Sequence, residues 1–427
     1  MKIFITGIIC FGSLTAFSQN INTLINAKET ERVEKILSSD EMQGRRVFTA
    51  GIEKAATFIE GEFKKAGLQP LGNAHSYRQE FEMVKPQLVS LQASIDGAPI
   101  NENNIVIASA KATISGTEKD QWSVIKIDKK ENPFIVAMKA METKGNKLVL
   151  VDTSLSKMFP RFKYFSRQLF STAPDVVFVL TSKDHFNSFS INATQSLTTQ
   201  KLANIVGLLP GRLKKNEYVI FSGHYDHLGI GKAVNNDSIY NGANDDAAGT
   251  TAVILLANYF KAMHNNQRSI VFAAFTAEEI GEYGSAYFSH QFNPDQVKAM
   301  FNIEMIGTES KWGKNSAYIT GFEKTDMGTI LQKNLKGSAF QFYPDPYPDQ
   351  QLFYRSDNTT LAKQGVPAHT ISTSKMDSEP NYHKPSDEIA TLNMSNMAEI
   401  IKAIAISSSS IISGKDTPTR VDTSDLK

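Results

Sequence analysis

The 427-residue chain contains 41% hydrophobic and 21% charged residues, and its formal net charge is +1. This balance is typical of a globular protein with a sizeable core, built as two or three domains or as one large domain with an insertion. The near-neutral charge argues against nucleic acid and against an anionic membrane surface as partners.

The first 20 residues, MKIFITGIICFGSLTAFSQN, have the pattern of an export signal. Lys2 precedes an apolar stretch that is short for a membrane span, which needs about 20 residues. We expect a signal peptide over residues 1–18, no stable membrane insertion after its cleavage, and a secreted or periplasmic protein. A retained membrane anchor is the alternative. The single cysteine, Cys10, lies here, so the mature chain would have neither disulfides nor thiolate metal ligands.

Residues 19–85 are expected to form the N-terminal helical part of the main domain. GIEKAATFIEGEFKKAG places Ile59 and Phe63 on one helix face, and Gly67 fits a helix C-cap. Residues 86–200 differ, because short β-like runs such as KLVLVD and DVVFVLTS alternate with polar segments. They predict a small inserted mixed domain, such as a lid or a substrate-facing module.

Strands and helices alternate over residues 201–412. EYVIFSG, RSIVFAAFTA, AMFNIEMIG, SAYITG and VPAHTIS predict strands, and AAGTTAVILLANYFKAM predicts an amphipathic helix. This alternation predicts an α/β fold with a mostly parallel mixed sheet flanked by helices. Sites in such sheets form at the carboxyl ends of the strands. The polar tail, residues 413–427, is expected to be mobile.

Groups that can bind a metal follow several of the predicted strands. The set consists of His224, Asp226, Asp245, Glu278, Glu279, Glu304 and His383. Imidazole and carboxylate are ligands that zinc prefers alongside thiolate. Each residue alone could be a surface or capping residue, but ligand types at successive strand ends of one α/β domain predict a zinc site.

Two pairs of these residues suggest a division of roles. Residues two apart at a strand end share a face, so His224 can face a metal while Asp226 bonds its other ring nitrogen. The adjacent Glu278 and Glu279 point in different directions. One can therefore bind metal while the other takes a proton from the attacking water.

The same set can also be divided between two metal ions. Asp245 could bridge them, with His224 and Glu304 on one ion and Glu279 and His383 on the other. A bridged pair of ions would hold both the attacking water and the polarised carbonyl.

The motifs resemble the co-catalytic two-zinc exopeptidases of clan MH, which include secreted bacterial leucyl aminopeptidases, aminopeptidase Y and glutamate carboxypeptidase. The resemblance covers roughly residues 200–410 and rests on GHYDHLG, NGANDDAAG, FTAEEIGEYGS, NIEMIG, YRSDN and NYHKPSDE. SSDEMQGRR resembles the family's N-terminal lead-in. The resemblance implies the zinc aminopeptidase fold, two zinc ions per chain and peptide substrates.

The resemblance also implies roles for individual residues. The implied zinc ligands are His224, Asp245, Glu279, Glu304 and His383, with Glu278 as general base and Asp226 as the residue that orients His224. A cis peptide is implied between Asp245 and Asp246. Residues 86–200 would be a divergent protease-associated domain.

Two positions depart from the family pattern. Glu304 stands where aspartate is usual, and its extra methylene could shift one zinc or change how the carboxylate binds. Asn358 replaces a histidine that is often present, from which we expect consequences in the substrate pocket rather than at the metals. Tyr382 and Tyr354 are both candidates to stabilise the tetrahedral oxyanion, and Tyr382 is preferred.

The sequence thus predicts a secreted zinc-dependent exopeptidase, most simply an aminopeptidase that uses a metal-activated water with Glu278 as base. One alternative is a glutaminyl cyclase-like transferase of the same fold with a single zinc. Another is a non-catalytic binding ectodomain, which would normally have lost ligands or the base. The choice between aminopeptidase, carboxypeptidase and dipeptidase stays open, as does the oligomeric state.

Overall fold

The computed structural model describes residues 21–72 and 74–426, so the expected signal peptide and Cys10 lie outside the described residues. The chain divides into two compact units. The large unit contains the chain up to Arg46, Ala50–Tyr77 and Ile205–Val421, and the small unit consists mainly of Arg78–Asn204. Among the described helices, none has the length and apolar character needed to cross a membrane.

The large unit is built around a mixed sheet. Its strands are β1 (Gln69–Pro70), the end of β10 (Phe189–Leu209), β11 (Lys214–His224), β14 (Arg268–Phe275), β15 (Val297–Ile303), β16 (Ser316–Ile319), β17 (Gln341–Pro344) and β18 (Ala368–Ser372). Their order is β17-β16-β18-β15-β11-β14-β10. The four central strands β18, β15, β11 and β14 are parallel to one another, whereas β10 runs antiparallel to β14 and β16 runs antiparallel to β18. The carboxyl ends of the four parallel strands therefore meet at one edge.

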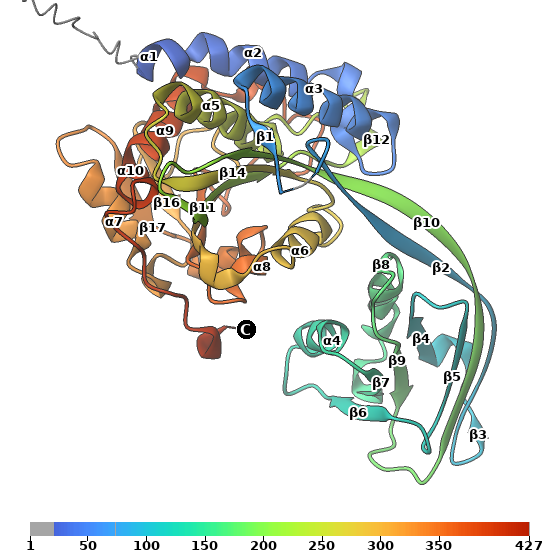
Figure 1. The fold of residues 1–427 in the computed structure, drawn as a ribbon. Helices are drawn as coiled ribbons and strands as arrows, with labels where there is room; N and C mark the ends of the chain where they lie inside the picture. The colour runs from blue at the N-terminus through green and yellow to red at the C-terminus, as the bar shows by residue number, and fades with distance from the viewer. Residues whose placement is uncertain (1–20, 73, 427) are drawn as a thin grey trace, which may run out of the picture. The chain divides into compact units, whose positions relative to one another are not determined.

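Helices cover both faces of this sheet (Figure 1). They are α1 (Ile21–Leu24), α2 (Ala27–Leu37), α3 (Ala50–Ala66), α5 (Ala248–Met263), α6 (Tyr283–Ser289), α7 (Met327–Asn334), α8 (Asn358–Ala362), α9 (Met394–Ser407) and α10 (Ser409–Ile412). One face carries α2, α3, α5 and α9, which contact one another, and the other carries α6 and α8. The central strand β14 is buried along its whole length, as expected for a strand covered on both faces.

Two features of α3 show how the sequence forms this layer. Ile52, Ile59 and Phe63 of α3 are buried in the main core. Gly67 follows the helix with φ +74°, a left-handed conformation that glycine adopts without steric cost. The apolar stripe therefore fixes which face packs, and the glycine ends the helix.

The small unit contains a separate four-stranded sheet with the order β4-β9-β7-β6. Its elements are β2 (Arg78–Ile95), β3 (Ala98–Pro99), β4 (Ile105–Ala108), β5 (Thr113–Thr117), β6 (Trp122–Ile127), α4 (Pro133–Glu142), β7 (Asn146–Asp152), β8 (Leu169–Phe170), β9 (Val176–Thr181) and most of β10. Val149 and Phe178 face a core shared with α4, and Leu148 and Val177 face a second core shared with β5 and β10. The runs KLVLVD and DVVFVLTS are its inner strands. Its identity as a protease-associated domain stays a prediction.

The α/β fold predicted for residues 201–412 is confirmed, but the expectation for the tail is wrong. Residues 415–421 are held against the large unit by hydrogen bonds. Arg268 donates to the carbonyl of Asp416, and Arg420 donates to the carbonyls of Pro294 and Val297. Polarity alone predicted a mobile segment, although the polar groups here satisfy backbone carbonyls.

Candidate metal centre

Three adjacent parallel strands deliver most of the candidate site. His224 is the last residue of β11, Glu278 and Glu279 follow β14, and Glu304 follows β15. Because β11 pairs in parallel with both β14 and β15, these ends lie side by side. Asp245 reaches the same edge from a short helical turn, Ala243–Ala247, that precedes α5.

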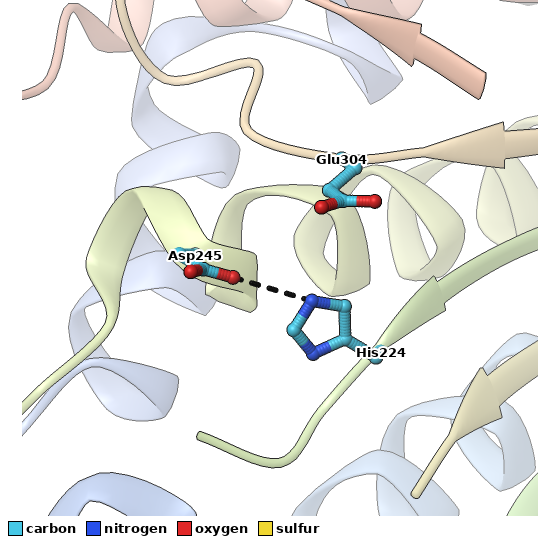
Figure 2. A group of neighbouring side chains, drawn as sticks. All are labelled: His224, Asp245 and Glu304. Carbon is cyan, nitrogen blue, oxygen red and sulfur yellow. Dashed lines mark ion pairs between the residues drawn. The ribbon is translucent and has the colours of Figure 1, made fainter. Parts of the chain in front are cut away.

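His224, Asp245 and Glu304 form the first ligand group (Figure 2). Their ligand atoms lie within 4.8 Å of one another. The Nε2 atom of His224 lies 3.2 Å from Oδ1 of Asp245. His224 and Asp245 are buried, so this half of the site lies inside the protein.

The second ligand group contains His227, Asp245, Glu279 and His383. His227 Nδ1 lies 2.7 Å from Glu279 Oε1 and 4.0 Å from Asp245 Oδ2. His383 Nε2 lies 3.3 Å from Asp245 Oδ2 and 3.2 Å from Glu279 Oε2. The two oxygens of Asp245 thus face the two groups, one oxygen to each.

Several buried ligand-type atoms in these groups lie close to one another but make no hydrogen bond of proper geometry. They are His224 Nε2, both ring nitrogens of His227, Glu279 Oε1 and Glu304 Oε2. Buried polar atoms normally have a partner, so unpaired lone pairs that converge need another explanation. Nitrogen and carboxylate oxygen donors gathered in this way fit a divalent cation of the zinc type.

Asp246 supports the site without facing either group. Its Oδ1 accepts hydrogen bonds from the N–H groups of Gly249 and Met305, and its Oδ2 accepts one from the N–H of His224. The bond between Asp245 and Asp246 is cis, which confirms the expectation. The helix begins at Ala248, one residue after the start of the predicted helical run.

Three other backbone positions at the site are unusual. Ala277, Met305 and His383 all have positive φ although none is glycine. Left-handed backbone costs an L-residue roughly 1–2 kcal/mol, so it persists only where the surroundings fix it. Ala277 precedes Glu278 and Met305 follows Glu304, which indicates that the chain turns sharply wherever it presents a ligand or base.

Asp226 sits behind His224, but with different contacts from those expected. The His224 ring nitrogen Nδ1 lies 3.1 Å from the backbone carbonyl of Asp226 and 3.9 Å from its carboxylate, which is too far for a hydrogen bond. The carboxylate instead accepts the N–H of Glu278 at 3.1 Å. Burial raises the pKa of Asp226 to about 7.

Glu278 lies next to the first group, with its Oε2 3.9 Å from His224 Nε2. Burial raises its pKa well above the usual range; His224 opposes this, and the neighbouring Glu304 and Glu279 add to it. For Asp245 the balance is reversed. Although burial opposes it, contacts with His224 and His383 hold its pKa well below the usual range.

The two tyrosine candidates lie in different surroundings. The Tyr382 ring stacks on His383 with centroids 3.9 Å apart, and the residue lines a cavity together with Glu304. Tyr354 packs edge-on against Phe353 and does not line that cavity. The geometry therefore favours Tyr382. Asn358 does not line the cavity either. Its Oδ1 accepts a hydrogen bond from the hydroxyl of Thr370, which lines the cavity.

Three residues near the site were not assigned by the sequence analysis. His227 lies three residues after His224 in GHYDHLG, and this spacing was its only signal. The two oxygens of Asp387, in NYHKPSDE, accept the N–H groups of Asn244 and Asp245. Arg45 gave no metal-ligand signal, but its position inside SSDEMQGRR lay within the resemblance.

Arg45 is fully buried and lies between the two ligand-bearing loops. Its guanidinium donates to the carbonyls of Tyr225, Asn241 and Gly242. Charge-assisted hydrogen bonds of this kind are stronger than neutral ones. Arg45 therefore joins the segment after His224 to the segment before Asp245.

Comparisons with known proteins agree with this geometry. Residues 204–407 match the pattern of peptidase family M28. The chain is accordingly an enzyme, a metallopeptidase, and the expected zinc-dependent exopeptidase class is confirmed.

Individual relatives cover different shares of the chain. The aminopeptidase YwaD of Bacillus subtilis is 22% identical over 380 residues, which is 84% of this chain and 80% of the relative. A probable zinc metalloprotease of Pyricularia oryzae is 33% identical over 112 residues, which is 26% of this chain and only 22% of that protein. The second match is therefore local.

Solved structures show the same fold over almost the whole chain. An aminopeptidase from Aneurinibacillus sp. strain AM-1 superimposes with a TM-score of 0.54 at 15% identity, covering 95% of this chain and 98% of that one. A zinc aminopeptidase from Bacillus subtilis gives the same TM-score and identity, covering 94% and 99%. Nothing in these comparisons favours the cyclase alternative.

Proposed function

We propose that the protein is an exported zinc aminopeptidase with two ions per chain, in which Asp245 bridges the two ligand groups. The observation that carries the proposal is the arrangement of Asp245, whose two oxygens face two separate sets of nitrogen and carboxylate donors. His224 and Glu304 would hold one ion. Glu279 and His383 would hold the other, and His227 would join this second set, because its Nδ1 lies 2.7 Å from Glu279 Oε1.

Glu278 is the general base of this proposal. Bound zinc would lower the pKa of water and polarise the substrate carbonyl. The Glu278 carboxylate, beside the first group, takes the proton of the attacking water and delivers it to the leaving amine. The Tyr382 hydroxyl donates a hydrogen bond to the oxyanion of the tetrahedral intermediate.

Two supporting residues keep these groups in place. Asp226 receives the N–H of Glu278 on its carboxylate and holds the His224 ring through its backbone carbonyl. Asp387 accepts two consecutive N–H groups at the turn that carries Asp245. Hydrogen bonds of this kind behind the metal ligands fix ligand orientation, and their loss typically lowers metal affinity or activity by about 10–100-fold.

The test uses purified mature protein, with metal analysis, on matched aminoacyl anilides with free or acetylated amino groups. We expect about two zinc equivalents and hydrolysis only of substrates with a free amino group. Equal cleavage of the acetylated series, or release of C-terminal residues, would overturn the aminopeptidase assignment. One bound zinc with cyclisation of N-terminal glutamine would instead support the cyclase alternative.

Export is a separate part of the proposal. It rests on the pattern of residues 1–18, which includes the only cysteine of the chain. Fractionation with N-terminal sequencing should find a mature chain that begins near Ser18 or Gln19 outside the cytoplasm. An intact N-terminus in the membrane fraction would favour a retained anchor.

A further inference from the structure

A small cavity begins at the metal centre and holds one cationic side chain. Glu304 and Tyr382 form the part of its wall that belongs to the metal centre. Its volume is about 380 Å³ when the space open to solvent is counted. The cavity therefore suits a single side chain or terminal group rather than a long peptide segment.

The cavity lining combines short hydroxyls with apolar groups. The hydroxyl-bearing residues are Thr320, Ser356, Thr370 and Ser372, and the apolar ones are Met305, Leu352 and Met376. Glu304 is the only anionic side chain of the lining, and it is already placed as a metal ligand. The lining would accept a short aliphatic stem that ends in a hydrogen-bonding group.

Arg355 supplies the only positive charge in the cavity lining. The residue is exposed, and within the described part of the chain its guanidinium makes one long hydrogen bond, 3.4 Å to Gln350 Oε1. Arg355 and Tyr382 line the same cavity. An arginine without a carboxylate partner beside a metal centre can bind a carboxylate with two parallel hydrogen bonds.

We propose that Arg355 makes this cavity selective for a substrate carboxylate. The inference rests on the proposed aminopeptidase function, because the scissile carbonyl must lie at the ligand groups and beside Glu278. The residue next to that carbonyl then has the cavity within reach, past Glu304 and Tyr382. Two sources of the carboxylate fit: the side chain of an N-terminal aspartate or glutamate, or the C-terminal carboxylate of a dipeptide.

The first experiment measures kcat/KM for glutamyl, glutaminyl and leucyl anilides, which all lack a C-terminal carboxylate. If the side-chain carboxylate is the ligand, the ratio of glutamyl to glutaminyl kcat/KM should fall roughly 10- to 100-fold in Arg355→Gln, as expected for loss of a charge-assisted contact. Arg355→Lys should keep part of the ratio. Lys375→Gln, an exposed charge near Met376 that does not line the cavity, should leave the ratio unchanged.

The second experiment compares the dipeptide Leu-Ala with its C-terminal amide. If the terminal carboxylate is the ligand, the free dipeptide is preferred, and Arg355→Gln removes that preference while the glutamyl ratio stays flat. If neither ratio depends on Arg355 although leucyl or glutaminyl anilides are hydrolysed, the proposal for Arg355 is wrong and the aminopeptidase function stands.

If no anilide is hydrolysed, measurements of ligand binding test the proposal instead. Calorimetry of the zinc-loaded protein with L-glutamate and L-glutamine isolates the side-chain carboxylate, because both amino acids carry the same α-amino and α-carboxyl groups. For the terminal carboxylate, the same titration uses the dipeptide Leu-Ala and its C-terminal amide. Tighter binding of either carboxylate, lost in Arg355→Gln, supports the cavity assignment, and equal affinities in both pairs overturn it.

Discussion

The two ligand groups of the metal centre are held in different ways. The first group takes His224 and Glu304 from the ends of adjacent strands β11 and β15, and the His224 side chain is buried. The second group takes His227 from the loop after β11 and His383 from the loop 373–388, and the His383 side chain is 37% exposed.

Strand ends therefore present His224 and Glu304 in the first group, whereas in the second group only Glu279 follows a strand and both histidines come from loops. Strand ends are fixed by ladders of backbone hydrogen bonds, whereas loops are more mobile and more often carry binding functions. The first group is therefore suited to keep its ion, and His383 marks the place where the second group is open to solvent.

Loss of Asp245 should have the largest effect, because this residue belongs to both groups. We expect Asp245→Ala to lose both metal equivalents and all measurable turnover, and elemental analysis of the purified variant checks this. Asp237→Ala on β13 (Asp237–Tyr240), outside both groups, should keep both ions. If one ion stayed at full occupancy in Asp245→Ala, Asp245 would be a ligand of the other ion only.

A change at Glu278 should separate chemistry from metal binding. Glu278→Gln keeps the side-chain shape but cannot accept the proton, so kcat should fall about 10²–10⁴-fold with both ions retained. Steady-state kinetics and metal analysis on the same preparation decide the point. Near-normal turnover at full metal content would remove Glu278 from its role.

Substitutions of the second-group histidines should expose the asymmetry between the two groups. His227→Ala and His383→Ala should each weaken binding of one equivalent by at least about 10-fold and leave the other equivalent unchanged. Titration of the apoprotein with Zn²⁺ measures the two steps. His290→Ala, an exposed histidine outside both groups, serves as control. Two unchanged equivalents in His227→Ala would show that His227 is not a ligand.

Asp226 acts behind the first group, so its replacement should be milder than loss of a ligand. Asp226→Asn should lower kcat by about 10–100-fold while both ions remain. The change is mild because the amide oxygen can still accept the N–H of Glu278. A loss of metal as severe as that in His224→Ala would make Asp226 a ligand itself. The comparison needs both variants at matched protein and zinc concentrations.

The smallest effect on the metal centre is expected at Glu34 of α2, whose replacement should change the stability of the fold rather than metal binding. Its Oε2 accepts a hydrogen bond from Thr251 in α5, and burial raises its pKa to about 8 from an ordinary value of 4.5. The unfolded chain releases this proton at lower pH than the folded protein. Raising the pH from 5 to 8 therefore lowers the free energy of unfolding by up to about 1.4 kcal/mol per pH unit.

Glu34→Gln removes this cost, so its stability advantage over the parent protein should grow from pH 5 to pH 8. Urea unfolding at several pH values measures it, with Glu31→Gln, an exposed glutamate of the same helix, as control. A difference that does not vary with pH would show that Glu34 is not protonated in the folded protein.

Much of the large unit could be predicted from local pattern. The runs RSIVFAAFTA and AAGTTAVILLANYFKAM became β14 and α5, because a continuous apolar run fits a strand covered on both faces and an amphipathic run fits a helix on a sheet. Ligand types at strand ends predicted where the site lies. The tail was misjudged, because the carbonyls that bind Arg268 and Arg420 are distant in sequence.

The sequence by itself determined the ligand chemistry, since with its only cysteine in the expected signal segment the mature chain must offer imidazole and carboxylate at the strand ends. Only the tertiary structure decided which of these groups converge. His227 joins Glu279 because the loop after β11 turns toward β14, and Arg45 binds carbonyls almost 200 residues away. Spacing along the chain carries no information about such contacts, because they depend on how separate elements pack around one buried centre.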